Sequence, residues 1–132
     1  VVKDKKVSRL GLIATQSEEK IVLLAYNYEE SDGEQATGND IISIQISGLK
    51  KNLYYRVESI QLDSKNNNTY QTWLSIGSPN SSRSINLEPL KKAASLDITD
   101  DFDLKTNEHG KANFKLNLKR RSAEILVITS KK

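Results

Sequence analysis

Few residues in this sequence are of types that could do catalytic chemistry. It contains one histidine, His109, just before Gly110, and no cysteine. A nucleophile–base pair needs a histidine or a close equivalent beside a serine or cysteine. Neither a Gly-rich phosphate loop nor a His-based metal motif is present. We therefore expect His109 to be a solvent-exposed turn residue. We predict no catalytic residue, no metal ligand and no cofactor for this chain.

Carboxylates are the other candidates, and they gather between Asp97 and Asp103. Calcium sites use closely spaced carboxylates, but this run lacks the Asp-x-Asp-x-Asp-Gly loop and Phe102 interrupts it. We predict a solvated acidic turn here. Glycoside hydrolysis needs two carboxylates facing each other across a cleft. No pair in this sequence stands at a strand end, as it would in a barrel enzyme.

The most distinctive stretch is Asp63–Pro79, which holds the only tryptophan, Trp73, and also Tyr70. An Asn-rich turn precedes these aromatics, and a Gly-Ser-Pro turn follows them. Their spacing is roughly helical, yet the segment is too short to decide between helix and strand. We expect Trp73 to anchor a small core or a docking surface, with sugar stacking as the alternative.

Length and charge set the broad class of the protein. The 132 residues predict a single domain, 1–132, and the net charge is +3. Basic residues cluster near both ends without interleaved aromatics, so we expect a solvated surface and no nucleic-acid partner. No apolar run approaches the ~20 residues that span a bilayer, so we expect no membrane partner.

The chain shows no signal peptide at Val1–Lys6 and no methionine, even at position 1. We therefore expect it to be an excerpt from a longer polypeptide. The absence of cysteine leaves the redox compartment open. We slightly favour a periplasmic or extracellular location over the cytoplasm.

The elements that must position these residues are mainly strands. Alternating or continuous apolar runs separated by Gly/Asn turns predict an all-β fold, an antiparallel β-sandwich (Ig/fibronectin-like) of about seven strands with one short helix. The clearest strand segments are 8–15, 20–28, 41–49, 53–63, 111–118 and 123–129. The inward-facing residues expected in two of them are Ile42, Ile44 and Ile46, and Phe114, Leu116 and Leu118.

Three segments carry more specific expectations. Lys20–Tyr28 is the most apolar run and predicts a central strand covered on both faces. Within Leu53–Asp63 the apolar phase shifts at Glu58–Ser59, where we predict a β-bulge. Leu87–Ser95 predicts the one helix, capped by Asn86, with Glu88 and Pro89 in its first turn.

The Trp73 stretch resembles a known signature. Gln61-Leu62-Asp63, the Asn67-Asn68 pair, Tyr70, Trp73 and Gly77-Ser78-Pro79 are similar to a motif near the C-terminus of family 39 glycoside hydrolases, the β-xylosidases and α-L-iduronidases. Segments 23–28, 87–96 and 125–128 extend the similarity. Gln61 stands where the family usually has arginine, and Asn66 where xylosidases often have histidine.

Enzymes of this family carry their catalytic glutamates on a (β/α)₈ barrel, which this chain lacks. The resemblance therefore implies the β-sandwich that follows the barrel and packs beside it in a β-xylosidase-like parent. It singles out Asp63, Asn68, Tyr70 and Trp73 as interface or sugar-contact residues.

Two other functions remain open. One is a carbohydrate-binding module, with an oligosaccharide stacked on Trp73 and on one or more of Tyr26, Tyr54, Tyr55 and Tyr70. The other is a structural or oligomer-forming sandwich that pairs through strand edges.

Overall fold

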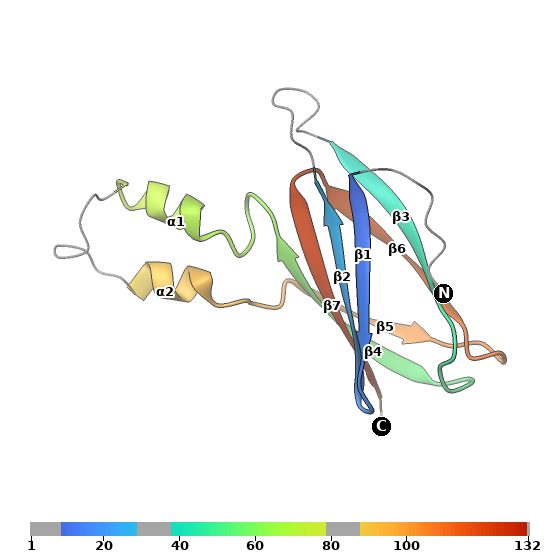
Figure 1. The fold of residues 1–132 in the computed structure, drawn as a ribbon. Coiled ribbons are helices and arrows are strands. Elements are labelled where there is room, and N and C mark those ends of the chain that lie inside the picture. Colours follow the sequence, from blue (N-terminus) through green and yellow to red (C-terminus); the bar gives the residue numbers. More distant parts are fainter. Residues whose placement is uncertain (1–8, 29–37, 79–87, 132) are drawn as a thin grey trace.

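The computed structural model describes residues 9–28, 38–78 and 88–131. Within them the chain forms seven strands and two short helices, arranged as a sandwich with a helical excursion (Figure 1). In chain order the elements are β1 (Leu10–Gln16), β2 (Lys20–Asn27), β3 (Asn39–Ile46), β4 (Tyr54–Leu62), α1 (Thr69–Ser75), α2 (Glu88–Ala94), β5 (Asp100–Lys105), β6 (Ala112–Lys119) and β7 (Ser122–Ser130). The predicted antiparallel β-sandwich of about seven strands is confirmed.

The two sheets of the sandwich are unequal. One has five strands in the order β1-β2-β7-β4-β5, and the other contains only β3 and β6. Every pairing is antiparallel. β2 is an interior strand of the larger sheet, between β1 and β7, which agrees with its apolar sequence.

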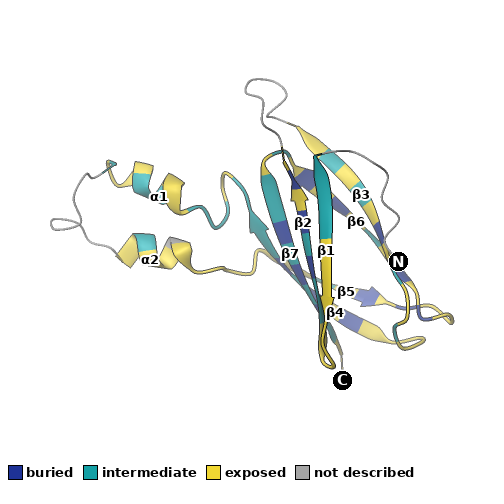
Figure 2. Cartoon of the chain, in the orientation of Figure 1, coloured by how far each residue is buried: buried dark blue, intermediate teal, exposed yellow. Residues whose placement is uncertain are grey.

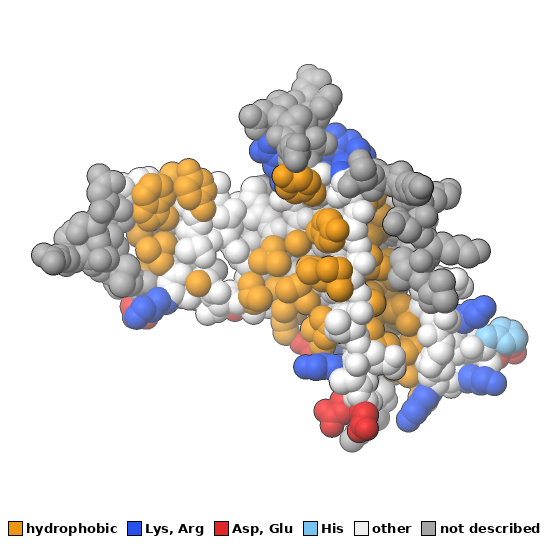
Figure 3. All heavy atoms as spheres, in the orientation of Figure 1, with side chains coloured by type: hydrophobic (Ala, Val, Ile, Leu, Met, Phe, Trp, Pro, Cys, Tyr) orange, Lys and Arg blue, Asp and Glu red, His pale blue; other side chains and the backbone are white. Residues whose placement is uncertain are grey.

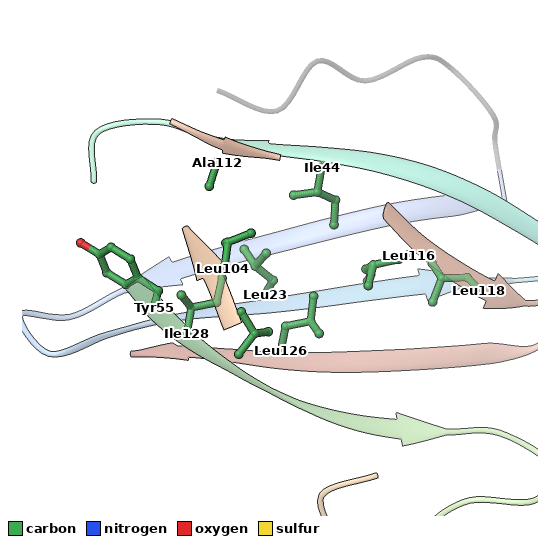
Figure 4. Packing of buried hydrophobic residues seen from close by; sticks show 11 residues of the cluster. Leu23, Ile44, Tyr55, Leu104, Ala112, Leu116, Leu118, Leu126 and Ile128 are labelled. Carbon is green, nitrogen blue, oxygen red and sulfur yellow. The ribbon is translucent and has the colours of Figure 1, made fainter. Parts of the chain in front are cut away.

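The core lies between the sheets (Figure 4). Side chains from β3 and β6, such as Ile44 and Leu116, meet Leu126, Ile128 and Val57 from the larger sheet. The predicted inward faces are correct, because Leu116, Leu118 and Ile44 are buried while Ile42, Ile46 and Phe114 pack against them half-buried. Burial of this apolar surface is the main force that holds the sheets together.

The predicted β-bulge at Glu58–Ser59 is wrong. β4 pairs with β7 in unbroken register from Tyr55–Ser130 to Leu62–Ala123. Regular alternation instead places Ser59 in the core beside Tyr55 and Val57, and turns Ile60 and Leu62 to the opposite face. The shift of apolar phase is therefore a change in which face is apolar, and the backbone stays regular.

The expectation that β2 is covered on both faces also needs correction. Leu23, Ala25 and Asn27 face the core and are buried, whereas Val22 and Leu24 on the other face are half-buried and Tyr26 is exposed. Among the described residues, no second layer covers that outer face. The sequence carries apolar residues on a face that this chain leaves partly open.

The acidic segment and the helices differ from expectation as well. Asp100–Lys105 is strand β5 rather than a turn, because Phe102 and Leu104 alternate with aspartates and pack inward. Two helices are present instead of one, since Thr69–Ser75 forms α1. The predicted helix is α2, with Glu88 in its first turn; Leu87 and the proposed cap Asn86 lie outside the described residues.

Glycine at position 11 has a packing role. Gly11 lies opposite Tyr26 in the β1–β2 register, and a β-carbon at position 11 would overlap the tyrosine ring. The Tyr26 ring therefore lies across the glycine on the outer face of the sheet. Among the described residues, no helix is both long and apolar enough to cross a bilayer.

Candidate functional site

The candidate functional site is the excursion between β4 and β5, whose described part, residues 67–78 and 88–97, we call the helical hairpin. It extends sideways from the sandwich, with α1 and α2 running side by side (Figure 1). α1 packs mainly on α2, and no strand makes comparable contact with it. None of the residues of α1 is buried, and Figure 2 shows the described part of both helices in exposed or intermediate colours.

The exposed surface of α1 is aromatic and aliphatic. Tyr70 is 61% exposed and Leu74 is 41% exposed. Trp73 is half-buried and stacks on Tyr70, with ring centroids 5.8 Å apart and an interplanar angle of 26°. Trp73 thus lies outside the sandwich core, in a small aromatic cluster on the hairpin.

The root of the hairpin is a turn that we call the elbow (Asp63–Asn68). The Asp63 side chain is 6% exposed, and its Oδ1 accepts hydrogen bonds from the backbone amides of Lys65 and Asn66, both at 2.8 Å. Burial alone would raise the Asp63 pKa, but these bonds, a further one from the Asn66 side chain and the nearby Lys119 ammonium lower it below its usual range. The ionised carboxylate therefore organises the turn.

Asn67 and Asn68 connect the elbow to both ends of the hairpin. Asn67, in the left-handed region with φ 52°, donates from Nδ2 to the carbonyls of Gln61 and Asp97 and accepts from the Asp97 amide at 2.9 Å. Asn68 caps α1 by accepting from the Gln71 amide at 3.1 Å. Asparagine is among the few residues that tolerate both tasks.

The end of the sandwich beside the elbow has an unusually polar interior. Glu124 and Ser59 face the core, 5% and 1% exposed, and the Ser59 hydroxyl donates to Glu124 Oε1. Burial raises the pKa of Glu124, and the neighbouring Asp100 and Asp63 raise it further against the effect of the Ser59 bond.

The two sheets are joined by charge at this same end. Arg9 makes a two-pronged contact with Asp40, 3.0 Å from Nε and 2.9 Å from Nη2, and the buried Asn27 donates to the same carboxylate at 2.9 Å. The Arg9 hydrogen bonds, with those of Asn27 and the charge of Arg120, lower the pKa of Asp40 to about 2 against the opposing effect of burial.

Two shallow hollows adjoin the elbow on the outer side of the larger sheet. One has a volume of about 510 Å³ and is lined by Tyr26, Asn27, Tyr28, Leu62, Arg121, Ser122 and Ala123. The other, of about 390 Å³, is lined by Leu62, Asp63, Ser64, Asn67, Asn68, Thr69 and Arg121. Leu62 and Arg121 line both, so the hollows adjoin each other, and we call the two together the depression at the elbow.

The residues with catalytic potential do not converge. His109 lies in the β5–β6 turn, 69% exposed, with Nε2 3.3 Å from its neighbour Glu108. Asp101 pairs with Arg56 at 2.6 Å and Asp103 with Lys131 at 2.8 Å, along one face of β5. Within residues 9–28, 38–78 and 88–131, no three acidic or histidine side chains form a group that could hold a metal ion.

The four residues singled out from sequence all lie at the hairpin, in two different settings. Tyr70 and Trp73 lie on the surface of α1, whereas Asp63 and Asn68 are engaged within the elbow. Sequence reasoning missed Asn67 as a connector and Leu62 as a lining residue. The out-of-phase Ile60 and Leu62 were the available signal for an apolar outer surface.

Comparisons with known proteins identify the fold. A scan against protein-family models finds no match, and a search of curated proteins finds none either. Solved structures do match: a monomeric β-xylosidase from Caulobacter crescentus CB15 has a TM-score of 0.68 at 13% identity. A GH39 enzyme from Xanthomonas axonopodis pv. citri has a TM-score of 0.70 at 9% identity. The bacterial orthologue of human α-L-iduronidase gives 0.64 at 12% identity.

These matches cover nearly all of this chain but a small part of theirs. They include 89%, 89% and 92% of this chain, and 26%, 25% and 22% of the respective solved chains. The chain thus spans about a quarter of the length of the structures it is similar to. The resemblance to family 39 enzymes that the sequence indicates is confirmed at the level of the fold.

Proposed function

We propose that this chain is a non-catalytic accessory domain of a longer, β-xylosidase-like glycoside hydrolase, and that its helical hairpin docks on the (β/α)₈ catalytic domain of the same polypeptide. The observation that carries the proposal is exposed apolar surface on α1, in a hairpin held away from the sandwich by an extensively hydrogen-bonded elbow. The partial coverage of the similar enzymes supports it.

The physical argument starts from the stability of the hairpin. Each helix has seven residues, and isolated helices shorter than ~12–15 residues are marginal in water. α1 gains no buried residue from the sandwich, and Tyr70 and Leu74 present apolar surface to solvent. Packing against a partner would bury this surface and stabilise both helices. The elbow fixes the direction in which the hairpin meets that partner.

The test uses two tyrosines of similar exposure. Tyr70 is 61% exposed on the hairpin, and Tyr54 is 51% exposed at the start of β4. In the native polypeptide, Tyr70→Ser should lower the free energy of unfolding by about 1–2 kcal/mol, because a docked aromatic is lost. Tyr54→Ser is the matched control and should have a smaller effect. In the isolated chain the two variants should behave alike in urea unfolding.

Two results would contradict this proposal. The first is a native polypeptide no larger than this chain, measured by immunoblot of the source organism. The second is a Tyr70→Ser variant of the native polypeptide that is as stable as Tyr54→Ser.

A carbohydrate-binding module remains the second candidate, because the exposed Tyr70–Trp73 pair could stack on a sugar. Tyr55 is 8% exposed in the core, so it cannot contribute to such a surface. Since Trp73 is the only tryptophan, its fluorescence reports directly on the pair. Titrating the isolated chain with xylotetraose should leave the spectrum unchanged; a saturable shift that Tyr70→Ser abolishes would favour the module.

A further inference from the structure

The outer surface of the five-stranded sheet changes character along its length. The register aligns Ile13, Leu24, Ile125 and Ile60 in one row across β1, β2, β7 and β4. The next row toward the elbow is Gly11, Tyr26, Ala123 and Leu62. At the opposite end of the sheet, the aligned residues are Lys20, Thr129 and Arg56.

We call the apolar part of this surface the outer apolar face, made of Ile13, Leu24, Tyr26, Ile60, Leu62, Ala123 and Ile125. Its largest exposures are 54% for Ile13 and 39% for Tyr26. Figure 3 shows hydrophobic side chains gathered over β1, β2 and β7, on the side from which the apolar atoms of the hairpin are also visible. The depression at the elbow lies between the two apolar regions.

The inner surface of the same sheet has the reverse arrangement. Near the elbow it carries the buried polar residues Asn27, Ser59 and Glu124 beside the apolar Leu12 and Ala25, directly behind the outer apolar face. At the other end it carries Val57 and Ile128, buried in the core. Because neighbouring residues of a strand face opposite sides, the elbow end places buried polar residues directly behind an apolar outer face. A free-standing sandwich would be arranged the other way round.

We infer that the outer apolar face is an interdomain interface, covered in the native polypeptide by the same catalytic domain that receives the hairpin. This inference rests on the proposed function. A single partner fits because the face, the depression and the hairpin adjoin one another at Leu62 and the elbow. The similar solved chains, about four times as long as the matched region, supply enough additional polypeptide for one.

The geometry also indicates what the partner presents. The part of the depression over the sheet has Leu62, Ala123 and the ring of Tyr26 among its lining, so it suits an apolar side chain. Toward the hairpin the lining becomes Asp63, Asn67 and Thr69, which suit a polar group. A convex element with an apolar ridge and a polar flank would contact the sheet and the hairpin together.

The test compares two isoleucines on opposite sheets. Ile13 lies on the outer apolar face, whereas Ile41 is 70% exposed on β3. In the native polypeptide, Ile13→Lys should speed the proteolytic release of this domain by roughly tenfold or more, since an interface anchor is replaced by a charge. Ile41→Lys should leave the release rate unchanged. The isolated chain should be monomeric in sedimentation, with equal urea midpoints for both variants.

Three outcomes would overturn the inference. Equal release rates for Ile13→Lys and Ile41→Lys would mean that no domain covers the face. A dimer of the isolated chain that Ile13→Lys dissociates would mean that a second copy covers it. If Ile13→Lys itself lowers the urea midpoint, Ile13→Thr replaces it in the same comparison. A native polypeptide of this chain's own size would remove the proposed function as well, whereas equal release rates in a longer polypeptide would remove only this inference.

Discussion

The two ends of the five-stranded sheet differ in which residues face the core and which face outward. At the end away from the hairpin, Val57 and Ile128 lie inside while Arg56 and Thr129 lie outside, as in a sandwich that faces water. At the hairpin end, Ser59 and Glu124 lie inside while Ile60 and Ile125 lie outside. The first end has the arrangement that stabilises a sandwich in water, and the second is the end for which we propose a neighbouring domain. The same strands can run through both ends, because alternation lets the polarity of the inner face and of the outer face change independently along a strand.

The largest expected effect comes from a substitution in the core between the two sheets. Leu126 is fully buried at the centre of the core, so Leu126→Ala should destabilise the isolated chain by about 2–5 kcal/mol. Ile13→Ala on the outer apolar face should cost well under half as much, because Ile13 is 54% exposed. Urea unfolding measures both. Similar losses would mean that the outer face already contributes as a core in the isolated chain.

A smaller loss of stability is expected from a substitution in the elbow, and it should affect the hairpin and not the sandwich. Asn67→Ala removes the side-chain bonds to Gln61 and Asp97 and disfavours the left-handed backbone at position 67, so the elbow should loosen by about 1–2 kcal/mol. Hydrogen exchange of the Asp97 amide should become faster, while amides in β7 should keep their protection. Asn67→Gly keeps the backbone freedom and should show the loss of the bonds alone. Uniform loss of protection throughout the chain would contradict a local role for the elbow.

The subtlest effect concerns the polar interior at the hairpin end. The folded state raises the Glu124 pKa above its ordinary value of 4.5, so the protonated form contributes stability that is lost as pH rises through the folded pKa. Glu124→Gln keeps a neutral group of similar size beside Ser59. The variant should match the native chain below about pH 4.5 and exceed its melting temperature at neutral pH.

The quantity to follow is the difference in melting temperature between Glu124→Gln and the native chain at each pH, because contributions common to both proteins cancel in it. Asp40, whose pKa is lowered by groups other than Glu124, affects both proteins equally and cancels. A gap that widens toward acid would show that Glu124 is stabilised as the carboxylate.

The sequence predicts the sandwich well because alternation and turn residues are local signals. Ile42, Ile44 and Ile46 face inward as their period requires, and β6 behaves in the same way. The bulge prediction failed because sequence reasoning assumed that apolar residues mark the inner face. Ile60 and Leu62 break that assumption, since their face is open in this chain.

The candidate site was only partly accessible to sequence reasoning. The aromatic and Asn-rich composition marks segment 63–79 as unusual. Which of its residues lie on the surface of α1 and which hold the elbow together depends on three-dimensional contacts. Asn67 reaches Asp97, thirty residues away along the chain, and no local pattern reveals that pairing. The outer apolar face needs the register of four strands before its rows become visible.

The position of the excursion in the chain has a consequence for evolution and engineering. β4 and β5 are adjacent antiparallel partners, with Ser59 opposite Asp100, so a turn of a few residues could connect them. Everything between them is an insertion that the sandwich does not need for its topology. The entropy cost of a longer loop grows only logarithmically with length. The insertion can therefore change in length and surface while the sandwich stays the same.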